Sequence, residues 1–143
     1  MSVKNLLSDN QKPDQILNVS ALNSNSLNLE SFANYTVDYD VSIVLAVDTY
    51  CGEIAVENWT LGVLLAGETK SMIVLNPLIT SSTNVVLLTG VTSGNADERL
   101  LRFSINTISA NQFSVDITNT SSTIDFPTMA QSQAKFLYCI VRT

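Results

Sequence analysis

Histidine is missing from this sequence of 143 residues. Its absence excludes the Ser-His-Asp and Cys-His mechanisms of nucleophilic catalysis, and also metal sites and pH switches built on imidazole. Cysteine is scarce: Cys51 and Cys139 are the only two, too few for a disulfide framework or a thiolate zinc site. Cys139 lies in a strand-like apolar run, so we expect a small buried hydrophobic residue. A disulfide with Cys51 stays open, although synthesis in the cytosol disfavours it.

Charged residues are also few, at 14% of the chain against 45% for hydrophobic residues. A typical soluble domain has about a quarter of its residues charged. Ser, Thr and Asn take their place here, and neutral polar side chains can be buried in an interface at a lower desolvation cost than charges. The composition therefore favours a protein whose surface makes extensive contacts with other subunits.

Clusters of basic residues and long apolar runs are missing as well. The seven basic residues are spread along a chain of net charge −6, so no basic stripe is available to neutralise phosphates and we expect no nucleic-acid partner. The longest apolar run, residues 41–47, is interrupted by Ser42 and is far shorter than the roughly 20 residues that span a bilayer. We expect no membrane partner. The first residues have no apolar segment typical of a signal peptide, which predicts synthesis in the cytoplasm.

The clearest pattern that is present runs from Tyr35 to Val47. Every second residue in it is apolar, whereas the residues between are polar as far as Ser42. Side chains of a strand alternate between its two faces, so the pattern predicts one long strand with an apolar wall on one side. Such a wall needs a second sheet packed across it.

Shorter alternating segments follow, separated by turn residues. They predict strands over 53–57, 59–65, 71–75, 85–88, 102–106, 113–117 and 136–141, with a brief helical step at 97–99. About eight strands without a long helix indicate an all-β, two-sheet antiparallel sandwich. We expect a jelly-roll-like topology. An immunoglobulin-like sandwich is the alternative, but this chain lacks the paired cysteines that flank a core tryptophan in that fold.

Residues 1–32 lack the strand-and-turn pattern of the rest of the chain. A Leu-Asn pair recurs there at a spacing of five, starting at residues 17, 22 and 27. Three copies are too few for a solenoid, so we interpret the segment as an extended N-terminal arm ahead of a sandwich domain over residues 33–143. We expect the arm to mediate assembly contacts with a neighbouring surface through Leu17, Leu22, Leu27 and Leu29.

No constellation of residues predicts a catalytic, metal or cofactor site. Asp38 and Asp40 share one face of the long predicted strand, whereas glycosidase carboxylates come from separate elements and calcium ligands converge in a loop. We interpret the pair as keeping that face solvated. Tyr50 and Trp59 are candidates for stacking against a sugar ring or another ligand. Tyr35 and Tyr39 share the phase of the apolar wall and are better explained by core packing.

The layout of the chain resembles a known class of protein. An arm from Lys4-Asn5-Leu6-Leu7 through Lys12-Pro13 precedes an all-β domain of roughly one hundred residues. That domain contains Asn111-Gln112-Phe113-Ser114-Val115 and ends in the strand Lys135-Phe136-Leu137-Tyr138. This resembles the small jelly-roll structural proteins of large double-stranded DNA viruses and virophages, of the minor capsid, penton or spike type. The resemblance implies a homotrimer or homopentamer whose arms reach across to neighbours, and it implies no catalytic or ligand residues.

We therefore expect a non-enzymatic structural component of a virus particle, made in the host cytoplasm and located in the virion. Its partners would be further copies of itself and other capsid proteins. The alternative is a carbohydrate- or receptor-binding sandwich, such as a fibre tip or a lectin that recognises a host glycan. That alternative predicts an exposed Tyr50 or Trp59 beside Asp or Asn side chains.

Overall fold

The computed structural model describes residues 32–40, 42–59 and 62–143. Within them the chain forms eight strands and a five-residue 3-10 helix. In chain order these are β1 (Phe32–Asp38), β2 (Ile43–Ala46), β3 (Cys51–Glu57), β4 (Thr69–Leu75), β5 (Val85–Val91), η3 (Ala96–Leu100), β6 (Leu101–Ser109), β7 (Gln112–Asn119) and β8 (Ala134–Val141). The predicted helical step at 97–99 lies within η3.

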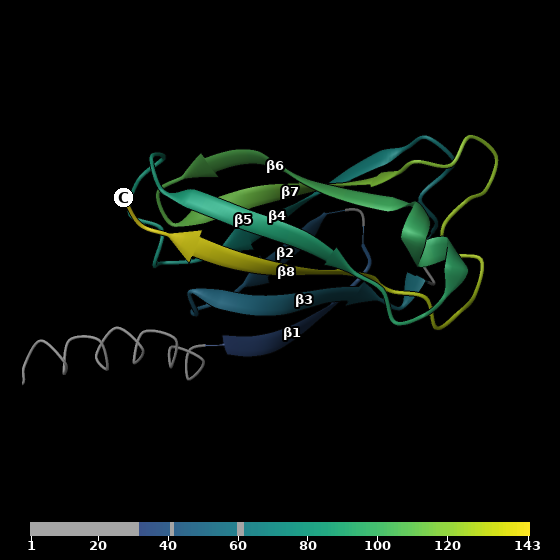
Figure 1. Ribbon diagram of the computed structural model, residues 1–143, viewed down its shortest axis with the longest axis horizontal. Helices are drawn as coiled ribbons and strands as arrows, with labels where there is room; N and C mark the ends of the chain where they lie inside the picture. The colour runs from purple at the N-terminus through teal and green to yellow at the C-terminus, as the bar shows by residue number, and fades with distance from the viewer. Residues whose placement is uncertain (1–31, 41, 60–61) are drawn as a thin grey trace, which may run out of the picture. The chain divides into compact units, whose positions relative to one another are not determined.

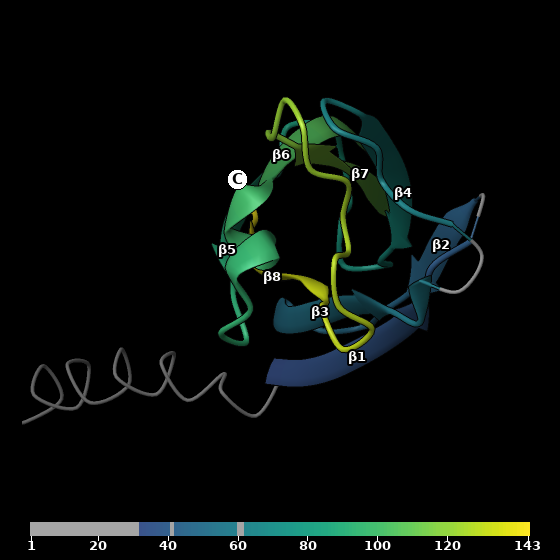
Figure 2. The ribbon, with the colours of Figure 1, turned by 90° about the vertical axis from the view of Figure 1, so that its right-hand side faces the viewer.

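The strands form two four-stranded sheets that pack face to face, which confirms the predicted all-β sandwich (Figures 1 and 2). The first sheet has the order β1-β3-β8-β5 and the second has the order β2-β4-β7-β6. Nearly every connection carries the chain from one sheet to the other. The exception is the tight hairpin between β6 and β7, where Asn111 adopts a positive φ of 68°.

Four of the strand pairs are antiparallel, as expected. The other two are parallel: β1 pairs with β3, and β2 pairs with β4. Both result from the same arrangement of the chain. The connection from β1 to β2 crosses from the first sheet to the second, and the connection from β3 to β4 makes the same crossing beside it. Two crossings in the same sense place their strands in parallel pairs.

The prediction of one long strand from Tyr35 to Val47 is wrong. The chain leaves the first sheet after Asp38 and enters the second at Ile43. Tyr39, in the connection, is buried in the core. In both strands the odd-numbered side chains point inward. Because the alternation continues unchanged through the crossing between the sheets, the sequence pattern does not reveal that the strand ends there. The apolar wall therefore exists, but it is divided between two facing sheets.

The predicted strand over 59–65 is also wrong. Asn58 has a positive φ of 55°, which ends β3 and turns the chain out of the sheet. Of the residues expected on one face, Trp59 is buried, whereas Val63 and Leu65 are exposed and Leu61 lies outside the described residues. The segment keeps one isolated bridge, from Leu64 to Phe126.

The core lies between the sheets and is made of the inward residues of both. Its largest fully buried side chains are Tyr138, Phe113, Phe126, Phe136, Ile43, Ile54, Leu64, Met72, Ile79, Ile117, Val56 and Val74. Tyr39 is in the core as expected: its ring stacks on Trp59 at a centroid distance of 4.2 Å. Phe126 packs against Trp59 in an edge-to-face arrangement, with the ring centroids 5.0 Å apart. Such aromatic pairs contribute roughly 0.5–1.5 kcal/mol beyond the burial of their area.

Cys51 and Cys139 form a disulfide between β3 and β8, which settles the pairing left open above. The two residues are directly opposite in the register, with their Cα atoms 4.1 Å apart. Each is half-buried on the outer face of the first sheet, so Cys139 is not the buried free thiol that its apolar neighbours predicted. The period-two pattern gives the face of a residue but not its partner, because β3 and β8 are far apart in sequence.

Candidate interaction surfaces

Two adjacent carboxylates are buried at one end of the sandwich, and they are the first place to look for chemistry. Asp97 and Glu98 lie in η3 and are only 4% and 5% exposed. Sequence reasoning assigned them to a helical step and missed their burial, because acidic residues are rarely buried unless they are paired. The structure supplies each with several donors.

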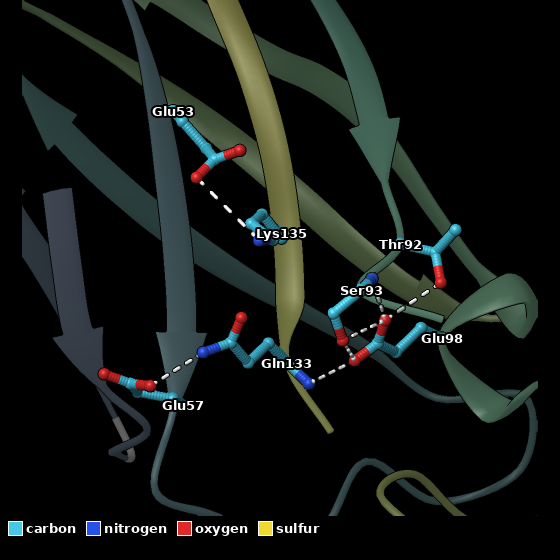
Figure 3. A network of polar contacts seen from close by, with 7 residues as sticks. All are labelled: Glu53, Glu57, Thr92, Ser93, Glu98, Gln133 and Lys135. Atoms are coloured by element: carbon cyan, nitrogen blue, oxygen red, sulfur yellow. Dashed lines mark hydrogen bonds and ion pairs between the residues drawn. The ribbon is translucent and has the colours of Figure 1, made fainter. Parts of the chain in front are cut away.

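Glu98 is held by the segments that flank β5 and β8 (Figure 3). Its carboxylate accepts hydrogen bonds from the Thr92 hydroxyl at 2.9 Å, from the Ser93 backbone N–H at 2.6 Å and from the Gln133 backbone N–H at 2.8 Å. Burial by itself raises the pKa of Glu98, but the hydrogen bonds from Gln133, Ser93 and Thr92 outweigh it and leave the pKa below its ordinary value.

Asp97 is held in the same way by the segment before β8. It accepts hydrogen bonds from the backbone N–H of Thr128 at 2.6 Å, from the Thr128 hydroxyl at 2.9 Å and from the Ser132 hydroxyl at 2.8 Å. Burial raises the pKa of Asp97, yet these donors lower it further than burial raises it. A carboxylate held ionised by donors on its oxygens is a poor general acid or base at neutral pH. We therefore interpret Asp97 and Glu98 as structural residues that hold the loops next to β5 and β8 in place through hydrogen bonds.

The remaining acids on the first sheet make ordinary surface contacts (Figure 3). The Gln133 side-chain amide donates to Glu57 at 2.8 Å, and the Lys135 ammonium lies 3.8 Å from Glu53. Among the described residues, no group of three or more His, Cys, Asp or Glu side chains is arranged to hold a metal ion.

The aspartates singled out from the sequence do not converge on a site. Asp38 ends β1 and accepts a 2.6 Å hydrogen bond from the Asn58 amide. Asp40 lies in the connection that leaves the first sheet. Asp48 follows β2 and accepts a hydrogen bond from the Tyr35 hydroxyl at 3.1 Å. This arrangement fits surface side chains better than an acid/base pair.

The two aromatic candidates for ligand binding lie in different surroundings. Trp59 is 7% exposed between Tyr39 and Phe126, so its ring face offers no open platform for a sugar. Trp59 still lines a surface hollow of about 340 Å³ together with Asn58, Val63 and the loop 127–130. Tyr50 is half-buried, and its hydroxyl accepts a hydrogen bond from Arg142 at 2.7 Å. The structure does not bring Tyr50 into the hollow beside Trp59.

The outer face of the first sheet carries an apolar patch, which we call the disulfide-face patch. The register places Phe32, the Cys51–Cys139 disulfide and Leu87 in one row across all four strands. Val85 and Val141 form the adjoining row. The patch consists of Phe32, Val85, Leu87, Leu137 and Val141 around the disulfide. Leu87 is its most exposed member, at 56%. A contiguous apolar patch of this kind marks a protein contact more often than scattered apolar residues do.

The outer face of the second sheet is different in composition. Its positions on β6 and β7 are hydroxyl and amide side chains, with Arg102 and Asp116 as the charges among them. At the edge of the sheet, Val44 lies opposite Ile73, and Leu75 follows. All three are exposed, Val44 at 49%. We call these three residues the β2–β4 patch. Sequence reasoning missed both patches, because apolar residues on both faces of a strand predict burial rather than a surface.

The fold and these two surfaces define a β-sandwich with a separate exposed apolar area on each of its two outer faces. Comparisons with protein-family models, with curated proteins and with solved structures found no match. No helix in the described part of the chain has the length and apolar character needed to cross a membrane. The predicted arm contacts at Leu17, Leu22, Leu27 and Leu29 lie outside the described residues.

Proposed function

We propose that this chain is a non-enzymatic structural component of a virus particle, of the minor capsid, penton or spike type, which assembles as a symmetric homo-oligomer. The observation that carries the proposal is the pair of apolar patches on opposite outer faces of one sandwich. A single copy exposes both patches to water, and contact with other subunits would cover them. Residues 1–32 are proposed to add contacts with neighbouring capsid proteins.

The two patches allow a head-to-tail contact between copies of the chain. When the disulfide-face patch of one copy contacts the β2–β4 patch of the next, the interface is heterologous, and such an interface closes into a cyclic oligomer if the rotation allows it. A trimer or a pentamer is the expected product. Identical patches that meet across a two-fold axis would instead give a closed dimer.

The rest of the surface is consistent with permanent contacts. The polar part of the second sheet's outer face is mostly Ser, Thr, Asn and Gln, whose burial costs less than the burial of charges. The disulfide between Cys51 and Cys139 fits a protein that works outside the cell, because disulfides persist in oxidising surroundings. A particle component would form it after release from the cytoplasm in which it is made.

The assembly is tested by changing one patch at a time in the full chain. Leu87→Lys and Ile73→Lys place a charge at the centre of each patch, at positions already exposed to water. Multi-angle light scattering should show the mass of a trimer or pentamer, or of two such rings joined together, for the unchanged chain and a smaller species for either variant. Ser104→Lys, on the exposed polar part of the second sheet, is the matched control and should leave the mass unchanged. A monomeric unchanged chain would contradict the proposal.

The viral part of the proposal needs a separate measurement. Mass spectrometry of purified virus particles that contain the chain should find it at a fixed stoichiometry to the main capsid protein. Its presence in infected cells but not in particles would contradict a structural role.

One observation favours the alternative, a carbohydrate- or receptor-binding module. The hollow that Trp59 lines also has Asn58 and Met129 on its wall, which gives it an apolar floor and a polar group. Glycan-array binding that is lost in Met129→Lys would support this function. Met129 is the better position to change because it is exposed, whereas Trp59→Ala would remove a buried core residue.

A further inference from the structure

Among the described residues the sandwich has four edge strands, and three of them carry features that discourage pairing with another chain. Strand β2 has only four residues, and the N–H of Asp48 just after it donates to the Tyr35 hydroxyl at 3.3 Å. Strand β6 has a register shift between Ile105 and Thr107. Strand β5 packs beside β6 where the two sheets approach each other (Figure 2). There Gly90 lies against the ring of Phe103. Short strands, bulges and covered edges are the usual protections against edge pairing.

Strand β1 has none of these protections in the described part of the chain. It runs for seven residues in an uninterrupted parallel register with β3 and contains no Lys, Arg or Pro. Asp38, its one charged residue, stands at its last position. On its other side β1 pairs with no strand among the described residues. A long, regular and nearly uncharged edge of this kind is a template for pairing.

The orientation of the backbone shows which groups are available. The N–H of Tyr39, just beyond β1, donates to the carbonyl of Glu57 at 2.8 Å, so the odd-numbered residues direct their backbone groups toward β3. Consecutive residues of a strand direct these groups to opposite sides. The backbone groups of Asn34 and Thr36 therefore face the open edge. The inward side chains of Ala33, Tyr35 and Val37 are only half-buried, because the sheet ends there.

We propose that β1 pairs with β1 of a second copy of this chain across a two-fold axis, so that two first sheets join into one continuous eight-stranded sheet. With Tyr35 on the axis, Asn34 lies opposite Thr36 of the second copy, and Phe32 lies opposite Asp38. Both residues of the Asn34–Thr36 pair face the open edge, so they exchange two backbone hydrogen bonds. The half-buried inward side chains of the two copies then cover one another.

The charges of β1 favour a second copy as the occupant of this edge. Antiparallel pairing about Tyr35 puts each Asp38 beside an aromatic ring and separates the two Asp38 side chains by the length of the strand. No like charges are opposed, although the chain as a whole carries a net charge of −6. The inward residues are apolar and the two central outward residues, Asn34 and Thr36, are polar in either direction of the strand, which suits a two-fold interface.

This interface is distinct from the patches of the proposed function, although it rests on the same proposal that the chain assembles with itself. The patches lie on the outer faces of the sheets and include one residue of β1, Phe32, whereas the proposed contact is made by the open edge of the β1 backbone. A ring held by the patches would be joined to a second ring through β1.

The test changes Asn34 and Thr36 to lysine together in the full chain. Both side chains are exposed on the outer face, so the domain should fold normally. Two pairs of opposed lysines should raise the dissociation constant of the two-fold contact about tenfold or more, as measured by sedimentation over a concentration series. The matched control is Ser104→Lys with Ser109→Lys, two exposed positions on β6, which should leave the constant unchanged.

A mixing experiment identifies the strand pairing itself. The variant with Asn34→Asp and Thr36→Asp should also dissociate, and mixing it with the lysine variant should restore the contact, since each lysine then lies opposite an aspartate. The inference is overturned if the unchanged chain makes no even-numbered species or if the lysine variant associates as tightly as the control. A purely trimeric or pentameric chain would overturn the two-fold contact and leave the proposed homo-oligomer intact.

Discussion

The two sheets of this sandwich share one core but hold their strands together differently on their outer faces. The first sheet carries a disulfide between β3 and β8 and an ion pair between Glu53 and Lys135. The second carries pairs of hydroxyls, such as Thr69 with Thr118 at 2.8 Å. The inner faces are apolar in both sheets. The core therefore requires a sandwich, whereas the outer faces determine how firmly each strand is fixed to its neighbour and what the surface offers to partners.

Breaking the disulfide should have the largest effect, and it acts on the first sheet. The link closes a loop with a sequence separation of 88 residues, and the chain-entropy model gives a stabilisation of about 4.6 kcal/mol for a loop of that length. Cys51→Ala with Cys139→Ala should lower the free energy of unfolding by about that amount, measured by urea denaturation. A reducing agent should destabilise the unchanged chain to the same degree and should not affect the double variant. Equal stability of the two proteins without reductant would contradict this estimate.

The junction between the sheets depends on Glu98. Its carboxylate accepts hydrogen bonds from residues next to β5 and β8 of the first sheet, while η3 leads directly into β6 of the second. Glu98→Gln would direct an amide N–H₂ at backbone donors. We expect a loss of about 2–3 kcal/mol. Glu57→Gln, which removes a charge from a half-buried contact with Gln133, is the control and should cost less.

The pH dependence of stability follows from the same two carboxylates. The pKa values of Asp97 and Glu98 are lowered in the folded protein, so the unfolded chain binds protons more readily. Their stabilisation is complete above the ordinary carboxyl pKa, about 4, and is lost as the pH falls through the lower folded values. Urea denaturation over an acidic pH series should show this decline in the unchanged chain. The combination of Asp97→Asn and Glu98→Gln should flatten it, and an unchanged slope would contradict the role assigned to them.

Gly52 reports on how closely the strands of the first sheet approach each other. A Cβ at this position would lie 2.8 Å from the carbonyl oxygen of Ala33 and 2.9 Å from the ring of Tyr138. Gly52→Ala should therefore destabilise the protein by about 1–3 kcal/mol, although Ala is normally preferred over Gly in a strand. Gly90→Ala is the control: its Cβ would meet the ring of Phe103, a side chain that can shift. Equal losses for the two variants would show that the backbone contact is not special.

Periodicity predicted the sandwich and most of its strands, because alternation along a strand is a local consequence of burial on one side. It placed the strand over residues 113–117 within the observed β7 and the one over 136–141 within β8. It joined β1 and β2 into one strand, because the crossing between the sheets keeps the same phase. It extended a strand through Trp59, where the positive φ of Asn58 ends the pairing.

The candidate surfaces were less predictable than the fold. The disulfide-face patch depends on which strands are neighbours: Phe32 and Leu87 are distant in sequence, and the pairings with β3 and β8 bring them into one row. The burial of Asp97 and Glu98 depends on donors from loops that precede or follow other strands. Composition did indicate a surface poor in charge, but it could not distinguish the apolar outer face from the hydroxyl-rich one.

The smallest expected effect compares the cross-strand pairs of the two outer faces directly. Double-mutant cycles on Glu53 with Lys135, and on Thr69 with Thr118, should each give a coupling energy of about 0.2–1 kcal/mol. The ion pair should weaken as salt is added, because ions screen charges near the surface. The coupling between the two threonine hydroxyls should be insensitive to salt, and Thr→Val keeps the β-branched shape in that cycle. If both couplings respond equally to salt, the outer faces do not differ in the type of interaction that holds their strands, and the contrast between the sheets reduces to the disulfide alone.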